Sequence, residues 1–153
     1  MSQAGWIIPM AAVKYRETRF MLLWSGAVET THEDLQFERL ALAEPDFWDH
    51  HTHEDVRRLL RTATDNMEWA DFDPREPLAR LKIPGLWVYG GRDRNVNVDL
   101  SIERLEMLIS AGHTNYSYRV LPHYDNQLGG INQDVIEPDV AWIRETVRRL
   151  HTQ

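Results

Sequence analysis

The sequence contains no cysteine. Its absence excludes disulfide bonds, thiolate catalysis and cysteine-ligated zinc from the chemistry of this chain. Lysine and arginine form no run long enough to follow a phosphate backbone, and the formal net charge is −7, so nucleic acid is not an expected partner. Long apolar runs are missing as well. The apolar stretch at 6–13 is far shorter than the ~20 residues that a membrane span requires, so we expect no membrane partner and a cytoplasmic protein.

The sequence does contain enough apolar material for a folded core. Hydrophobic residues make up 42% of the 153 positions, and six residues are tryptophan. A chain of this length usually buries roughly two-thirds of the surface that it exposes when unfolded. We find no internal repeat and no low-complexity segment, so residues 1–153 are predicted to form one domain.

Three apolar runs predict strands, at 19–26, 86–89 and 116–121. Gly26 and Gly90 follow the apolar residues of the first two runs. Helical patterns separate the runs, which predicts an α/β fold with a small three-stranded parallel sheet and right-handed crossovers. In such sheets ligands bind beyond the carboxyl ends of the strands. The loops that follow the three runs are therefore where we expect a functional site.

Capping residues and helical spacing predict where the helices begin and end. Thr31 and Thr52 each precede an aspartate by three residues, which is the capping-box pattern for two helices. A further helix is expected over 98–112, and Pro138 is expected to begin the last one. An apolar helical stretch near the N-terminus is expected to break at Pro9, because proline removes a helical hydrogen bond.

Two segments carry a family resemblance. The first is residues 2–12 (SQAGWIIPMAA), followed by the apolar run that ends in Trp24-Ser25-Gly26. The second begins at 72–74 (FDP), continues through 83–93 (IPGLWVYGGRD) and ends at 98–105 (VDLSIERL). Both resemble serine esterases and prolyl-oligopeptidase-type peptidases of the α/β-hydrolase superfamily, over the C-terminal half of that fold. The resemblance implies a truncated α/β-hydrolase domain with a helical, cap-like insertion at about 30–70.

The same resemblance implies a set of site residues. The family's nucleophilic serine stands in G-x-S-x-G at a sharp strand-to-helix turn, and Ser2 matches it. Asp93 matches the acid that orients the catalytic histidine, and the backbone N–H of Gln3 matches one oxyanion-hole donor. Asn126 stands where the family has its histidine. Because asparagine takes up no proton at neutral pH, His123 in the same loop is the candidate base.

Three hypotheses about function follow. The first is an esterase-like serine hydrolase that acts on small carboxylic esters by acyl transfer and needs no cofactor. The second is a non-catalytic pseudoenzyme or dimeric interaction module that kept the fold and lost the catalytic histidine. The third is a truncated gene product without an evolved role.

Two further expectations concern partners and metals. The resemblance makes the 19–26 strand an interior strand whose first neighbour is missing here, so we expect a homodimer joined along its edge. The histidine-rich segment 49–53 (DHHTH) has no standard zinc spacing, and no metal site is predicted.

Overall fold

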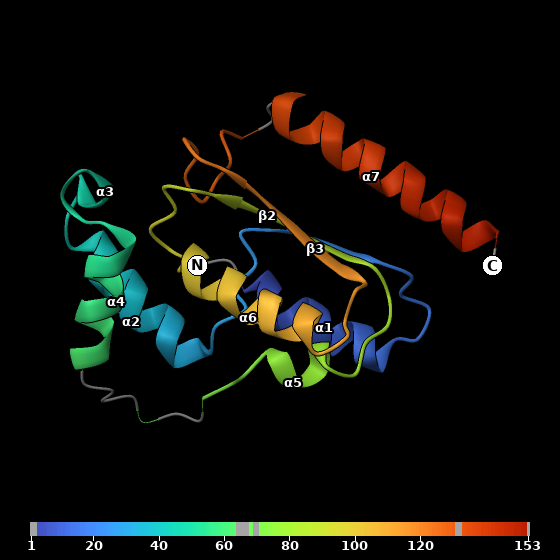
Figure 1. Cartoon of the computed structure of the whole chain (residues 1–153), viewed down its shortest axis with the longest axis horizontal. Helices are drawn as coiled ribbons and strands as arrows, with labels where there is room; N and C mark the ends of the chain where they lie inside the picture. The colour runs from blue at the N-terminus through green and yellow to red at the C-terminus, as the bar shows by residue number, and fades with distance from the viewer. Residues whose placement is uncertain (1–2, 64–67, 69–70, 131–132, 153) are drawn as a thin grey trace.

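The computed structural model of the chain describes residues 3–63, 68, 71–130 and 133–152. It contains a three-stranded parallel sheet in the order β1-β2-β3, with β1 at Met21–Trp24, β2 at Gly85–Gly90 and β3 at Tyr116–Leu121. Met21 pairs with Gly85, which pairs in turn with Tyr116, so the three strands start level. The predicted α/β class with a small parallel sheet flanked by helices is confirmed (Figure 1).

The central strand, β2, is buried along its whole length. It extends the predicted 86–89 run by one glycine at each end. β1 is shorter than the predicted 19–26 run. It begins at Met21, which pairs with the first residue of β2, and it ends before Ser25, which turns the chain with a φ of 47°.

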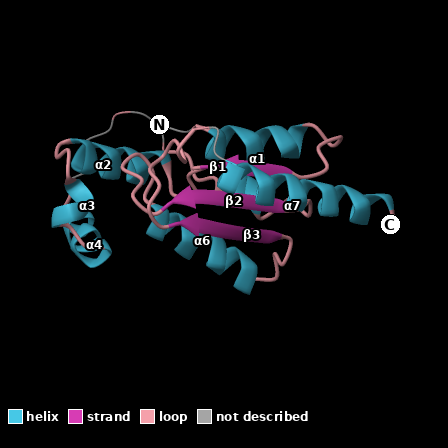
Figure 2. Ribbon diagram, turned by 90° about the horizontal axis from the view of Figure 1, so that it is seen from above, coloured by secondary structure: helices cyan, strands magenta, loops and turns pink. Residues whose placement is uncertain are grey.

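Helices cover the sheet on both faces. α1 (Ala4–Lys14), α5 (Arg75–Leu78) and α6 (Val98–Ser110) lie on one face, and α7 (Gln133–His151) lies on the other (Figure 1). α2 (Thr31–Leu42), α3 (Phe47–His50) and α4 (His53–Thr62) lie beyond the carboxyl ends of the strands (Figure 2). In the parts of the chain that the structure describes, no helix is both long and apolar enough to cross a membrane.

Separate apolar layers hold these helices in place. Alternate side chains of β2 pack in opposite apolar layers, because successive side chains of a strand point to opposite faces. Trp87 belongs to the larger layer, with Trp6 of α1 and Leu105 of α6, whereas Val88 meets Val135 of α7 on the other face. The α2–α4 group has a small core of its own, made of Phe37, Ala41, Phe47 and Val56.

α1 and α7 each contain a proline, and the helix boundaries expected at Pro9 and Pro138 were wrong. α1 continues through Pro9, and α7 begins before Pro138 and continues through it. A proline inside a helix costs ~3 kcal/mol or more. In α1, burial of Pro9 and Trp6, three residues apart on one helix face, offsets this cost. In α7, the buried carboxylate of Asp139 accepts a hydrogen bond from Trp24 Nε1 at 2.6 Å and anchors the turn after the proline.

The helix caps agree with the predicted pattern at one position and differ by one residue at the other. Thr52 caps α4 in a reciprocal capping box with the aspartate three residues later, as predicted. α2 is capped by Thr30 and not by Thr31, and the reciprocal partner is Glu33. The difference has a physical consequence, because Asp34, the expected partner of Thr31, is buried in the protein interior instead.

Gly5→Ala tests the contact between α1 and the chain that leaves β1. A Cβ atom on Gly5 would lie 2.1 Å from the carbonyl oxygen of Ala27. The substitution should lower the free energy of unfolding by about 1–3 kcal/mol, because the helix has to move off the sheet. Urea denaturation followed by circular dichroism measures the change. Lys14→Ala, at an exposed position of the same helix, should change it by less than ~0.5 kcal/mol. Equal effects of the two substitutions would contradict this close packing.

Candidate functional site

Polar residues from three separate loops meet at the carboxyl edge of the sheet. Ser25 follows β1, Asp93 lies in the loop after β2, and Asn126 lies in the loop after β3. Ser25 Oγ donates to the backbone carbonyl of Asn126 at 3.0 Å, and Asn126 Nδ2 donates to Asp93 Oδ2 at 3.1 Å. These three residues, which we call the edge cluster, join the three loops by hydrogen bonds.

Ser25 is buried and holds an unusual backbone conformation. Its φ of 47° lies in the left-handed region, which costs on the order of 1–3 kcal/mol when a residue other than glycine adopts it. The Ser25 N–H still donates to the carbonyl of Val88 at 2.9 Å, so the chain leaves the sheet directly after this bond. The hydroxyl bond to the loop after β3 helps to hold the turn in place.

Asp93 is fully buried, and its carboxylate accepts hydrogen bonds from three amides. Oδ1 accepts from the N–H groups of Asn95 at 2.7 Å and Val96 at 2.9 Å, and Oδ2 accepts from Asn126. Burial raises the pKa of Asp93 above its ordinary value, and these donors, with the nearby Ser25 hydroxyl, oppose the rise. The amides stabilise the charged carboxylate by hydrogen bonding and are too weakly acidic to protonate it at neutral pH.

The edge cluster contains no histidine; its titratable group is the carboxylate of Asp93. Acyl transfer by a serine requires a group that accepts the hydroxyl proton near neutral pH. The amide of Asn126 does not do so, and the Ser25 hydroxyl donates to a peptide carbonyl, which is too weakly basic to remove the proton. The hydrogen bonds of the edge cluster fasten the three loops to one another.

Of the residues that the sequence singled out, the structure brings Asp93 and Asn126 together and leaves His123 outside their hydrogen bonds. His123 is exposed and lines a cavity of about 390 Å³, together with Trp48 and Arg92. Trp48 Nε1 donates to the backbone carbonyl of Asp93 at 2.7 Å, so one wall of the cavity is attached to the edge cluster.

The predicted nucleophile, Ser2, lies outside the described residues. Gln3, the predicted oxyanion donor, precedes α1, and its carbonyl accepts a hydrogen bond from the N–H of Trp6 at 3.1 Å. The N-terminal end of α1 lies at the carboxyl edge of the sheet, because Gly5 packs against Ala27 just after β1. Gln3 therefore lies at the same end of the sheet as the edge cluster.

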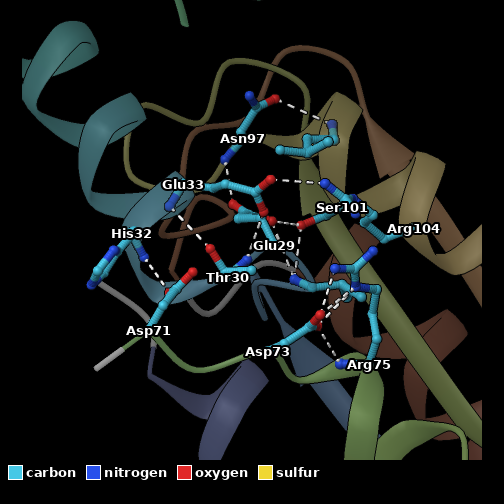
Figure 3. Close-up of polar contacts among 12 residues, drawn as sticks. Glu29, Thr30, His32, Glu33, Asp71, Asp73, Arg75, Asn97, Ser101 and Arg104 are labelled. Atoms are coloured by element: carbon cyan, nitrogen blue, oxygen red, sulfur yellow. Dashed lines mark hydrogen bonds and ion pairs between the residues drawn. The ribbon is translucent and has the colours of Figure 1, made fainter. Parts of the chain in front are cut away.

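A buried glutamate ties the loop after β1 to α6. Glu29 Oε1 accepts from the N–H of Asn97 at 2.9 Å, and Oε2 accepts from the Ser101 hydroxyl and from the N–H of Val28 at 3.2 Å (Figure 3). The backbone carbonyl of Glu29 accepts from Trp6 Nε1 at 3.0 Å. This one residue thus joins α1, the loop between β1 and α2, and the N-terminal turn of α6.

Asp34 of α2 is fully buried within hydrogen-bonding reach of Glu29. No N–H or O–H donor of the described chain reaches either of its carboxyl oxygens. Burial, together with the negative charges of Glu29 and Glu38, raises the pKa of Asp34 to about 9, and burial also raises the pKa of Glu29. A protonated Asp34 that donates to Glu29 accounts for both observations, because two buried carboxyls share one proton more readily than they hold two charges.

Ion pairs and backbone contacts surround this acid pair. Asp71 accepts from the N–H of His32 at 2.9 Å, and Arg104 of α6 donates to Glu33 at 2.8 Å (Figure 3). Both bonds hold the N-terminal turn of α2, and with it Asp34, against its neighbours.

The three histidines of segment 49–53 contact two carboxylates, because His50, at 3.7 Å, shares Glu44 with His51. His51 lies 2.9 Å from Glu44, and His53 lies 3.4 Å from Asp99. Both rings also pack on aromatic side chains of α3. Over the residues that the structure describes, no group of three His, Asp or Glu side chains is placed to hold a metal ion.

The chain has no significant match among protein-family profiles, curated proteins or solved structures. The site geometry therefore has to support any functional assignment by itself.

Three of these site residues were not expected from the sequence. Ser25 was visible at the end of a predicted strand, where the following glycine signals a turn, but its positive φ was not visible. Glu29 and Asp34 look like a loop residue and a cap residue, because charged side chains are seldom buried. No local pattern shows that these two acids meet.

Asp34→Asn should make the stability of the protein less dependent on pH. Asp34 holds its proton more tightly in the folded chain than in the unfolded chain, where an aspartate has a pKa of about 4. The stabilisation from this proton is complete at low pH and is lost as the pH rises toward the folded pKa. The amide keeps the donor and does not titrate. Its advantage over wild type in free energy of unfolding should therefore grow by on the order of a few kcal/mol from about pH 5 to pH 9.

Urea denaturation at a series of pH values measures this trend. Asp46→Asn is the matched control, because Asp46 is exposed and its side chain makes no cap bond to α3. The control should show no such trend, and a constant difference between Asp34→Asn and wild type over the whole range would contradict the shared proton.

Proposed function

We propose that this chain forms part of an α/β-hydrolase-type domain that binds small carboxylic esters or the corresponding acids without hydrolysing them. The observation that supports this most directly is the hydrogen bond from Asn126 Nδ2 to Asp93 Oδ2 at 3.1 Å. In the family that the sequence resembles, the partner of this acid is the catalytic histidine. An amide in that place holds the acid equally well and transfers no proton.

The cavity beside the edge cluster supports a binding function. Its volume of about 390 Å³ lies in the range of about 300–1,000 Å³ that is usual for small-ligand pockets. Arg92 and Arg94 line it and can meet a carboxylate, although Asp46 and Asp125 also line it, and Trp48 and Tyr124 supply aromatic surface. Both arginines are held in place, Arg92 by Asp49 at 2.5 Å and Arg94 by two backbone carbonyls.

An active esterase is the second candidate, and His123 is the residue that favours it. The imidazole lines the cavity, on the same loop as Asn126. With Ser2 as nucleophile, Gln3 as oxyanion donor and Asp93 as acid, His123 would have to accept the serine proton from within ~3 Å. The Asp93 carboxylate already accepts hydrogen bonds from three amide groups and makes none with His123. This argues against the esterase, because in the family the acid orients the histidine.

An ester hydrolysis assay separates the two candidates. Wild type, Ser2→Ala and His123→Ala should release nitrophenolate from p-nitrophenyl acetate at equal rates, because neither side chain takes part in acyl transfer. Butyrate should nevertheless bind saturably in calorimetry, and Arg94→Gln should weaken that binding by roughly tenfold. Arg16→Gln, an exposed arginine outside the cavity lining, is the control and should bind as wild type does. Loss of turnover in both the Ser2 and His123 variants, with a phosphonate adduct mapped to Ser2, would establish the esterase instead.

We also propose that two copies of the chain associate along β1. The N–H groups of Met21 and Ser25 point toward β2, so strand alternation turns the N–H of Leu22 to the outer edge. α1 lies beside β1, at the β1 edge of the sheet (Figure 2). It exposes Ile7 (52%) and Met10 (43%). A two-fold axis beside β1 would pair the two edges and cover both helices.

Sedimentation velocity at micromolar concentration should therefore show a dimer. Met10→Lys should weaken it by at least tenfold, because the charge would lose its water in the interface. Met107→Lys is the matched control, since Met107 is 54% exposed on α6, away from β1. A monomeric wild type would rule the dimer out, and equal effects of the two lysines would rule out this interface.

A further inference from the structure

A hollow lies at the end of the sheet opposite the edge cluster, between the amino-terminal ends of the strands and the C-terminal half of α7. Its volume is about 600 Å³, and an adjoining hollow of about 260 Å³ shares Arg19 and Leu150 with it. Both views of the molecule show α7 extending past the points where the strands begin (Figures 1 and 2). The two hollows together are called the α7 groove below.

Positive charge gathers around the α7 groove, although the chain as a whole has 24 acidic residues against 17 lysines and arginines. Arg19, Lys82 and Arg149 line the groove, and no described Asp or Glu does. Arg149 is bonded to Glu145 at 2.9 Å. Arg19 and Lys82 make no ion pair or hydrogen bond with any described residue. Two cations that pair with no described residue create, in an acidic protein, a local potential that favours an anion.

The rest of the lining is apolar or uncharged. Phe20 and Trp142 meet edge to face with 5.8 Å between ring centroids, and Val147 and Leu150 of α7 continue the apolar surface. A simple inorganic anion would leave this surface in contact with water. The occupant that matches the whole groove has an anionic end and an apolar body.

We propose that the α7 groove is a second binding site and that it takes a medium-chain carboxylate. The carboxylate lies between Arg19 and Lys82, where a guanidinium fork and an ammonium group both suit it. The hydrocarbon chain lies along Trp142 and Leu150. This site is independent of the proposed ester-binding cavity, because the two lie at opposite ends of the strands and share no lining residue.

Titration of the full chain with decanoate, below its micellar concentration, tests the proposal. Tryptophan fluorescence should report saturable binding. Arg19→Gln and Lys82→Gln should each weaken it by roughly tenfold, because each removes one charged contact. Both side chains are exposed, so the fold should tolerate the changes, and unchanged thermal melting would show this. Arg16→Gln, three residues before Arg19 and outside the groove lining, should bind decanoate as wild type does.

Two further ligands separate the contribution of the carboxylate charge to binding from that of the hydrocarbon chain. Decanol should bind at least tenfold more weakly than decanoate, and acetate should not bind detectably. Binding of decanoate that is unchanged in both the Arg19 and Lys82 variants, or equalled by decanol, would overturn the proposal. A tetraglutamate peptide that displaces decanoate with equal affinity would also overturn it, since the groove would then recognise an acidic protein segment.

Discussion

The buried carboxylate of Glu29 is the interaction on which the carboxyl edge of the sheet depends. An ionised carboxylate taken from water without partners costs more than the ~5–15 kcal/mol by which a domain is usually stable. Three donors, from Val28, Asn97 and Ser101, meet this cost, and Asp34 keeps a proton beside them. Because two of these donors belong to the start of α6, the carboxylate is stable only when α6 packs where it does.

A second buried acid, Asp93, organises the rest of this edge in the same way. Its donors come from its own turn and from Asn126 of the loop after β3, which in turn accepts the Ser25 hydroxyl bond. Tyr89 at the end of β2 donates to the carbonyl of Gly26 at 2.9 Å, and burial, with the charges of both acids, raises the pKa of its phenol. The carboxyl edge of the sheet is therefore a polar layer in which hydrogen bonds join the loops after all three strands.

The two ends of the sheet differ because α7 is anchored unevenly. Asp139 accepts hydrogen bonds from Trp24 of β1 and Arg119 of β3, and Arg119 also donates to the carbonyl of Val135. Among the described residues these bonds reach only the N-terminal half of the helix. The C-terminal half borders the α7 groove, where Arg19 and Lys82 pair with no residue of the described chain. The N-terminal half of α7 is therefore fixed to β1 and β3, and its C-terminal half forms one wall of the proposed binding groove.

The sequence by itself determined the order of strands and helices, the Thr52 cap and the polar character of the loops after the strands, because apolar runs, caps and turns are local signals. Asp93 was predicted from the family resemblance, because it matches the position of the family's acid. Only the tertiary structure decided that α1 continues through Pro9 and that Glu29 and Asp34 are buried together. The free energy that stabilises these buried acids comes from groups that are distant in the sequence. One is the Ser101 hydroxyl, which lies 72 residues from Glu29 and donates to it. A local sequence pattern does not encode which distant donor will reach a buried carboxylate. At the carboxyl edge of the sheet these long-range contacts determine the arrangement of the polar residues.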